Sequence, residues 1–212
     1  MQTIWKRFHA LLMAVLLTAS IGATALASEP DALPFTDVTE TDWFYDVVSA
    51  AYAGGLMSGI TDTTFAPNAG ATRAMLVTIL WRLEGSPEAE GGTSFRDVAE
   101  DAYYAPAVRW ASAQKIVNGN TNGTFSPNGN ITREQMAVIL YRYAQSKDAS
   151  IAETEYAELD FADTKQVSEY AYEAMCWCAS ERIITGNREK VDPQGTASRA
   201  QVAAILVRLG DD

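Results

Sequence analysis

The sequence predicts an all-α protein made of three tandem helix-loop-helix copies of one unit, and two observations carry this prediction. The first is repetition: the same order of short motifs occurs three times along the chain. The second is spacing, because apolar residues in each copy recur every three or four positions, as on one buried face of an α-helix. A single helix pair cannot bury such faces, so the three copies are expected to pack on one another.

Each copy opens with a Phe-x-Asp segment and an aromatic residue, and its first helical stretch leads to a glycine. The aspartates are Asp37, Asp97 and Asp163; the aromatic residues are Trp43, Tyr103 and Tyr170; the glycines are Gly59, Gly119 and Gly186. A turn-rich loop with proline follows. Copies one and two keep an offset of 60 residues, whereas copy three begins 66 residues beyond copy two and has an insertion and a shortened loop. Repetition therefore covers most of the chain.

The second helix of each copy is predicted to begin at a Thr/Ser-Arg pair. These pairs are Thr72-Arg73, Thr132-Arg133 and Ser198-Arg199. Threonine and serine are favoured N-caps, and Gln135 and Gln201 complete a capping box that Met75 cannot form. The three second helices carry the widest apolar stripes and are the best candidates for a shared core.

The arginine in each helix start needs an explanation, because a cation in the first turn costs about 0.3–1 kcal/mol against the helix dipole. One interpretation is an ion pair with a nearby acid such as Asp97. The other is an anion site, in which exposed N–H groups and a guanidinium converge on a carboxylate or phosphate. Both interpretations are open at this point, and they are compatible.

Residues 1–27 are predicted to be an export signal. They combine a basic start, an apolar segment over 11–17 and a small-x-small site at Ala25-Leu26-Ala27, with cleavage before Ser28. Without them, 14 Lys and Arg remain against 27 Asp and Glu, a net charge of −13, and the one histidine is lost. Imidazole metal sites and His-dependent triads are thereby excluded, and nucleic acid or membrane insertion after cleavage is not expected.

No motif predicts catalysis, a cofactor or a metal site. The stretch over 118–123 resembles the start of a calcium loop, but it has no carboxylate and Gly129 stands where glutamate is needed. Acidic pairs that could hydrolyse glycosides do not stand apart from linkers and caps. Cys176 and Cys178 are expected to leave one helix in different directions, as buried structural thiols and not as a disulfide.

Together, the motifs F-x-D-V, an aromatic residue, I/L-x-x-G, F-x-P-N and T-R-A/E resemble the S-layer homology repeat. The resemblance covers three copies, at 34–84, 94–144 and 160–210. It implies a pseudo-threefold module in which one helix from each repeat forms a central bundle. It also implies a secreted protein at the bacterial cell wall or surface layer, anchored non-covalently to secondary cell-wall polysaccharide that often carries pyruvate ketals.

Carried over to this sequence, the resemblance assigns glycan binding to grooves between repeats. The arginines Arg73, Arg133 and Arg199, with Thr72, Thr132 and Ser198, fall on the family's T-R-A-E motif and would meet the ketal carboxylate. The aspartates would orient the arginines. The aromatic residues either stack on sugars or pack internally, and the glycines either admit a glycan or end a helix. Met75, Val191 and Gln194 depart from the pattern, so the first and third grooves are the less regular ones.

A second class of function is also compatible with the repeats. The chain could be a structural protein that self-assembles into a surface array, or that scaffolds other surface proteins, without contacting a glycan directly. A glycan binder sediments with purified cell walls, whereas an assembling protein changes its mass alone.

Overall fold

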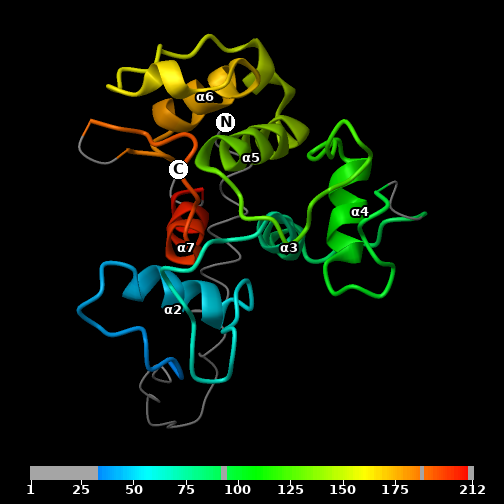
Figure 1. The fold of residues 1–212 in the computed structure, drawn as a ribbon, viewed down its shortest axis with the longest axis vertical. Helices are drawn as coiled ribbons and strands as arrows, with labels where there is room; N and C mark the ends of the chain where they lie inside the picture. The colour runs from blue at the N-terminus through cyan, green and yellow to red at the C-terminus, as the bar shows by residue number, and fades with distance from the viewer. Residues whose placement is uncertain (1–32, 92–94, 187–188, 210–212) are drawn as a thin grey trace, which may run out of the picture. The chain divides into compact units, whose positions relative to one another are not determined.

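A computed structural model describes residues 33–91, 95–186 and 189–209, and over these ranges its regular elements are helices (Figure 1). Within those ranges β-pairing is limited to isolated bridges, such as the one between Thr132 and Thr196. The all-α prediction of repeated helix-loop units is confirmed. The predicted export signal lies outside the described residues, and no helix inside them is long and apolar enough to cross a membrane. The described chain divides into two compact units.

The first unit contains the residues up to Ala69 together with those from Ser198 onward. Its helices are α2 (Tyr45–Ala53) and α7 (Arg199–Arg208), which pack side by side. Ser198 caps α7 with the predicted capping box. Its hydroxyl accepts a hydrogen bond from Gln201 N–H, and Gln201 Oε1 accepts one from Ser198 N–H. The buried side chains of this unit include Phe35, Val48, Phe65, Val202 and Leu206.

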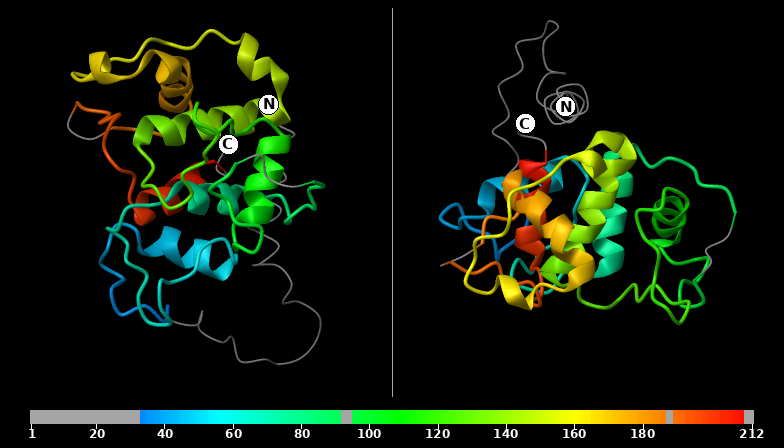
Figure 2. Two further views of the ribbon diagram at one scale, coloured as in Figure 1. Left: turned by 45° about the vertical axis from the view of Figure 1, so that its right-hand side comes forward. Right: turned by 90° about the horizontal axis from the view of Figure 1, so that it is seen from above.

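The second unit runs from Gly70 to Ala197 and holds two helix pairs. Helix α3 (Arg73–Leu83) packs on α4 (Ala105–Ala113), and α5 (Arg133–Lys147) packs on α6 (Tyr172–Ser180), as Figure 2 shows for α5 and α6. Three short 3₁₀ helices, η1 (Ala149–Glu153), η2 (Thr164–Gln166) and η3 (Glu169–Ala171), fill the longer connection from α5 to α6. The insertion predicted in copy three falls in this connection.

A closed ring of backbone hydrogen bonds joins three residues of the second unit. Ala71 donates to the Ala197 carbonyl over 2.8 Å, Ile131 donates to Ala71 over 2.9 Å, and Ala197 donates to Ile131 over 3.0 Å. All three residues are fully buried. Each one directly precedes the N-cap of a second helix, so the three copies meet at equivalent positions. The ring has threefold order; the central bundle of one helix per repeat stays a prediction.

Candidate functional site

The start of each second helix is covered by backbone from the loop of another copy. In α3, Arg73 N–H donates to Gly129 O and Ala74 N–H to Pro127 O, each over 3.0 Å, while Met75 N–H donates to Thr72 Oγ1 over 3.2 Å. Helix α5 repeats this with Gly195, Pro193 and Thr132, and α7 with Ala69, Pro67 and Ser198. The expectation of exposed N–H groups at these helix starts is therefore wrong, since the first three already have partners.

The three arginines reach into the same loops. Their Nε atoms donate to backbone carbonyls: Arg73 to Phe125 over 2.8 Å, Arg133 to Val191 over 2.7 Å, and Arg199 to Phe65 over 2.7 Å. The order is cyclic, because each arginine bonds to the loop of the next copy and the third returns to the first. A loop carbonyl accepts from a cation at a position that a helix start alone disfavours. The arginines thus connect successive repeats.

The aromatic residue of the loop decides what lies beneath the guanidinium. Arg73 Cζ is 4.9 Å from the centre of the Phe125 ring, and Arg199 Cζ is 4.5 Å from that of Phe65. Such contacts add a favourable cation–π interaction. Val191 takes this place under Arg133 and offers no ring, so copy three differs here as its sequence suggested. Arg199 is also the most enclosed: it is buried, and its Nη2 donates to Ser58 O over 2.6 Å.

Each aspartate of the Phe-x-Asp segments holds the loop of its own copy. Asp97 accepts from Phe125 N–H over 2.7 Å and from Ser126 N–H over 2.8 Å. Asp37 does the same for residues 65 and 66, and Asp163 for residues 191 and 192. The second residue of each pair has a positive φ, between 49° and 58°, which non-glycine residues adopt only when held. These aspartates therefore shape the loop to which the arginine bonds.

The interpretation of the helix-start arginines as ion-pair partners of an acid such as Asp97 needs correction at Arg73. The carboxylate oxygens of Asp97 are bonded to backbone N–H groups, and Arg73 Nε is bonded to a carbonyl. Burial lowers the pKa of Arg73, while the nearby Tyr170 and Asp97 act to raise it. Asp97 therefore influences Arg73 through its charge and through the loop that both residues hold.

The three candidate aromatic residues lie at the surface, with 66% of Trp43, 66% of Tyr103 and 61% of Tyr170 exposed. Trp43 meets Phe44 edge-on with ring centres 5.4 Å apart, and Tyr103 meets Tyr104 in the same way at 5.0 Å. One side of each ring is thus supported while most of its area faces solvent. Large exposed rings at equivalent places in all three copies are suited to stacking on sugars.

The glycines serve internal packing. A Cβ on Gly59 or Gly186 would come within 2.6 Å of Cε1 of Phe35 or Phe161, and one on Gly119 would overlap Phe95. Each glycine thus lets the Phe of its own Phe-x-Asp segment lie against the backbone. They do not end the helices, which stop six residues earlier. That turn is made by Gly55, Lys115 and Arg182, whose φ values are 67°, 59° and 55°.

In the second unit Tyr170 is bonded to Glu134, a residue that was not among the predicted site residues, and it is close enough to Arg73 to be influenced by its charge. Tyr170 OH donates to Glu134 Oε1 over 2.9 Å, and the charge of Arg73 acts to lower the Tyr170 pKa. Glu134 is 2% exposed and also accepts from Ser168 N–H and Ser168 Oγ. The signal was present in the sequence, because Glu134 follows the helix-start arginine where copies one and three have alanine.

Hydrogen bonds keep Glu134 charged in spite of its burial. Burial acts to raise the Glu134 pKa, but the bonds from Ser168 and Tyr170 outweigh this and hold the pKa below its ordinary value. For Tyr170, burial and the bond to Glu134 raise the pKa to about 12. This part of the unit therefore contains a fixed anion, a neutral phenol and a guanidinium.

The cysteines are free thiols, and both are buried in α6. Burial raises the pKa of each, which disfavours the reactive thiolate form. The expectation of structural thiols agrees with this environment. Within the described ranges, no three His, Cys, Asp or Glu side chains are grouped so that they could hold a metal ion.

Comparison with known proteins identifies the repeats. The family model of the S-layer homology domain matches residues 34–74, 94–137 and 160–203. The chain is 29% identical over 210 residues to an endoglucanase of Bacillus sp. (strain KSM-635), covering 96% of this chain and 22% of that protein. It is 31% identical over 180 residues to an amylopullulanase of Thermoanaerobacterium thermosulfurigenes, covering 82% of this chain and 9% of that protein.

A third relative is the cellulosome-anchoring protein of Acetivibrio thermocellus, 25% identical over 162 residues, covering 74% of this chain and 34% of that protein. This chain thus spans 9% to 34% of the length of these three relatives. The family model covers more than half of the chain in three tandem segments. The chain therefore belongs to the S-layer homology domain family.

Proposed function

We propose that this chain is a non-catalytic module, with repeats at 34–84, 94–144 and 160–210, that attaches to the bacterial cell wall from outside the cell. Its ligand would be secondary cell-wall polysaccharide, with pyruvate ketal carboxylates as the charged groups. The observation that carries this proposal is that each of the three copies presents an exposed aromatic ring and places an arginine at the start of its second helix. A ring to stack on and a cation to pair with are the two groups that an acidic sugar requires.

The relatives support attachment as the shared property. They include polysaccharide-degrading enzymes, a surface-layer 125 kDa protein of Lysinibacillus sphaericus and a cellulosome-anchoring protein. A region common to enzymes with different substrates and to surface-layer proteins is not expected to hold the catalytic centre. The names of the surface-layer protein and of the cellulosome-anchoring protein state the surface location or anchoring that a wall-binding module would provide.

The arginines can take part in binding while holding the repeats together. The bond from Arg73 to Phe125 engages Nε, and a guanidinium has four more N–H donors on its terminal nitrogens. A charge-assisted hydrogen bond to a carboxylate contributes about 1.5–3 kcal/mol. Equivalent arginines in three repeats would bind one polymer repeatedly, and later contacts form at high effective concentration.

Co-sedimentation with purified cell walls tests this function. The chain is expected to pellet with untreated walls and to remain in the supernatant after the pyruvate ketals are removed by mild acid. Arg133→Gln should reduce the pelleted fraction, whereas Arg96→Gln, which removes an exposed cation of the same unit, should not. Equal sedimentation with and without ketals would overturn the acidic-sugar ligand.

The alternative of a self-assembling or scaffolding protein predicts a different result. Such a protein would form large particles in sedimentation velocity without walls, and its particle mass would not respond to ketal removal. Absence of wall binding together with such particles would replace our proposal with this one.

A further inference from the structure

Glu134 distinguishes one of the three helix starts from the other two. It stands at the second position of α5, where α3 has Ala74 and α7 has Ala200. All three side chains are buried, at 1–2% exposure. An alanine methyl group cannot accept a hydrogen bond, so the carboxylate contacts of Glu134 have no counterpart at those two positions.

The hydrogen bonds to Glu134 determine what the neighbouring groups can offer to a ligand. Tyr170 OH and Ser168 Oγ both use their hydroxyl hydrogen on Glu134 Oε1, at 2.9 Å each. Each hydroxyl then presents its oxygen lone pairs as acceptors only. A sugar hydroxyl can donate to such an oxygen. A carboxylate has only acceptors, so it cannot form a hydrogen bond with either group.

Charge acts in the same direction. Glu134 is an anion within hydrogen-bonding distance of the Tyr170 hydroxyl, and Arg73 influences that same hydroxyl. A ketal carboxylate that stacked on Tyr170 and approached Arg73 would therefore meet a negative charge as well as a positive one. Like charges at close range in a partly buried site repel strongly, which offsets the attraction of the arginine.

We propose that Glu134 determines sugar specificity at Tyr170, so that this position accepts an uncharged sugar through its hydroxyl groups and disfavours one with a carboxylate. This inference rests on the proposed binding of wall polysaccharide and refines it. The repeats would then bind different sugars of one polymer. Tyr170 would bind an uncharged sugar, and the aromatic residues of the other copies, in which alanine replaces Glu134, would bind acidic sugars.

A matched pair of ligands tests the proposal on the full chain. One is a hexosamine glycoside with a pyruvate ketal, and the other is the methyl ester of the same ketal, which keeps the shape and removes the charge. Binding is followed through the ¹⁹F signal of Tyr170 in fluorotyrosine-labelled protein, assigned by its loss in Tyr170→Phe. The measured quantity is the ratio of the acid's Kd to the ester's Kd at this residue.

In the unsubstituted chain the ester is expected to bind at Tyr170 more tightly than the acid. Glu134→Ala, which recreates the helix start of copies one and three, should shift the ratio toward the acid by about tenfold or more. Glu134→Gln keeps the size of the side chain and should shift it in the same direction, and this variant serves if the alanine protein is poorly folded. Glu173→Gln, on the neighbouring helix α6, should leave the ratio unchanged.

An unchanged ratio in both Glu134 variants would overturn the proposal, as would tighter binding of the acid than of the ester by the unsubstituted chain. Absence of any Tyr170 response to the acid in the Glu134 variants would count against it too. Co-sedimentation with walls, run in parallel, separates this failure from that of the general function. If ketal-dependent sedimentation persists while the ratio does not move, only the role of Glu134 is wrong.

Discussion

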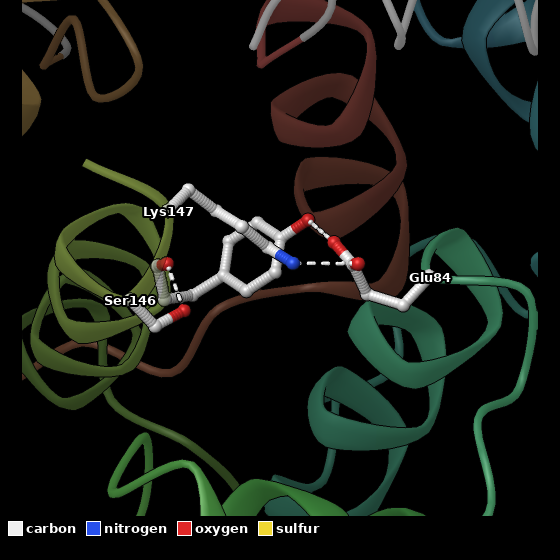
Figure 3. A network of polar contacts seen from close by, with 4 residues as sticks. Glu84, Ser146 and Lys147 are labelled. Carbon is white, nitrogen blue, oxygen red and sulfur yellow. Dashed lines mark hydrogen bonds and ion pairs between the residues drawn. The ribbon is translucent and has the colours of Figure 1, made fainter.

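The hydroxyl of Tyr143 on α5 lies 2.6 Å from Oε1 of Glu84, the C-cap of α3. Lys147 pairs with the other oxygen of Glu84, also over 2.6 Å, and its ammonium lies 5.6 Å from the centre of the Tyr143 ring (Figure 3). Burial and the bond to Glu84 raise the pKa of Tyr143, so the phenol stays protonated as the donor. Glu84, Tyr143 and Lys147 thus join the C-terminal ends of α3 and α5, at the opposite end of each helix from its capped start.

Tyr143→Phe should therefore destabilise the protein without affecting its surface. Tyr143 is buried, and loss of its hydrogen bond to a charged acceptor costs about 1.5–3 kcal/mol. Thermal unfolding followed by circular dichroism measures the effect, and Tyr52→Phe, at an exposed ring, is the control. An unchanged Tm for Tyr143→Phe would mean that Lys147 alone satisfies Glu84.

Gly186→Ala should be severely destabilising, and Gly123→Ala mild. Both glycines have a positive φ, 68° and 76°, so alanine is strained at either site by about 1 kcal/mol. At Gly186 the new methyl group would also lie 2.6 Å from Phe161, whereas at Gly123 nothing lies within 4 Å. We expect an additional loss of about 1–3 kcal/mol at Gly186, from overpacking. Chemical denaturation compares the two, and equal losses would show that the Phe161 contact is easily relieved.

Asp97 should make stability depend on acidic pH. Burial acts to raise its pKa, but the bonds from Phe125 and Ser126 outweigh this and lower it. A lowered folded-state pKa stabilises the fold above the unfolded value of about 4. This contribution is lost as pH falls through the folded-state pKa.

Asp97→Asn removes one of the two acceptors and should cost about 1–2 kcal/mol at pH 7. The difference between variant and parent should shrink as pH falls below about 4, because the parent then loses its advantage. Melting curves from pH 7 to pH 2.5 measure it, with the exposed Asp62→Asn as control. A difference that is constant with pH would contradict the bracing role of the carboxylate.

Arg133→Ala should weaken both wall binding and the joint between repeats two and three. The lost Nε bond to Val191 O predicts about 1–2 kcal/mol of destabilisation, and the lost carboxylate contact predicts about tenfold weaker sedimentation. Arg142→Ala removes a cation from the same helix and controls for charge. A lower Tm with unchanged wall affinity would reduce Arg133 to its structural role.

The helix starts could be predicted from sequence because their determinants are local. Thr132 with Gln135, and Ser198 with Gln201, form the expected capping boxes, and α3 begins at Arg73 although Met75 cannot complete one. The ends of the first helices were less accessible, because Lys115 and Arg182 make turns that are more often made by glycine. Residue propensity therefore suggested Gly119 and Gly186 as the helix ends. The presence of glycine at these two positions is better explained by their close packing against Phe95 and Phe161.

The partners of the arginines could not be predicted. Arg73 bonds to a carbonyl 52 positions away and Arg199 to one 134 positions away, and a backbone carbonyl leaves no trace in the sequence. The Thr/Ser-Arg motif showed that a cation stands at each helix start, and the family resemblance suggested an external anion as its partner. Neither indicated that the partner is a backbone carbonyl in the loop of the next copy. Glu134 was overlooked for a related reason, since an acid in a helix's first turn is favourable in itself.

The backbone ring of Ala71, Ile131 and Ala197 limits how such a protein can be lengthened or shortened. Every member donates one hydrogen bond and accepts one, so deleting one copy leaves a buried donor and a buried acceptor without partners. A fourth copy would find no donor or acceptor of the ring left to bond with. Shortened chains with two copies should accordingly gain or borrow the missing segment from another molecule. Variation in copy number would then proceed by whole triplets.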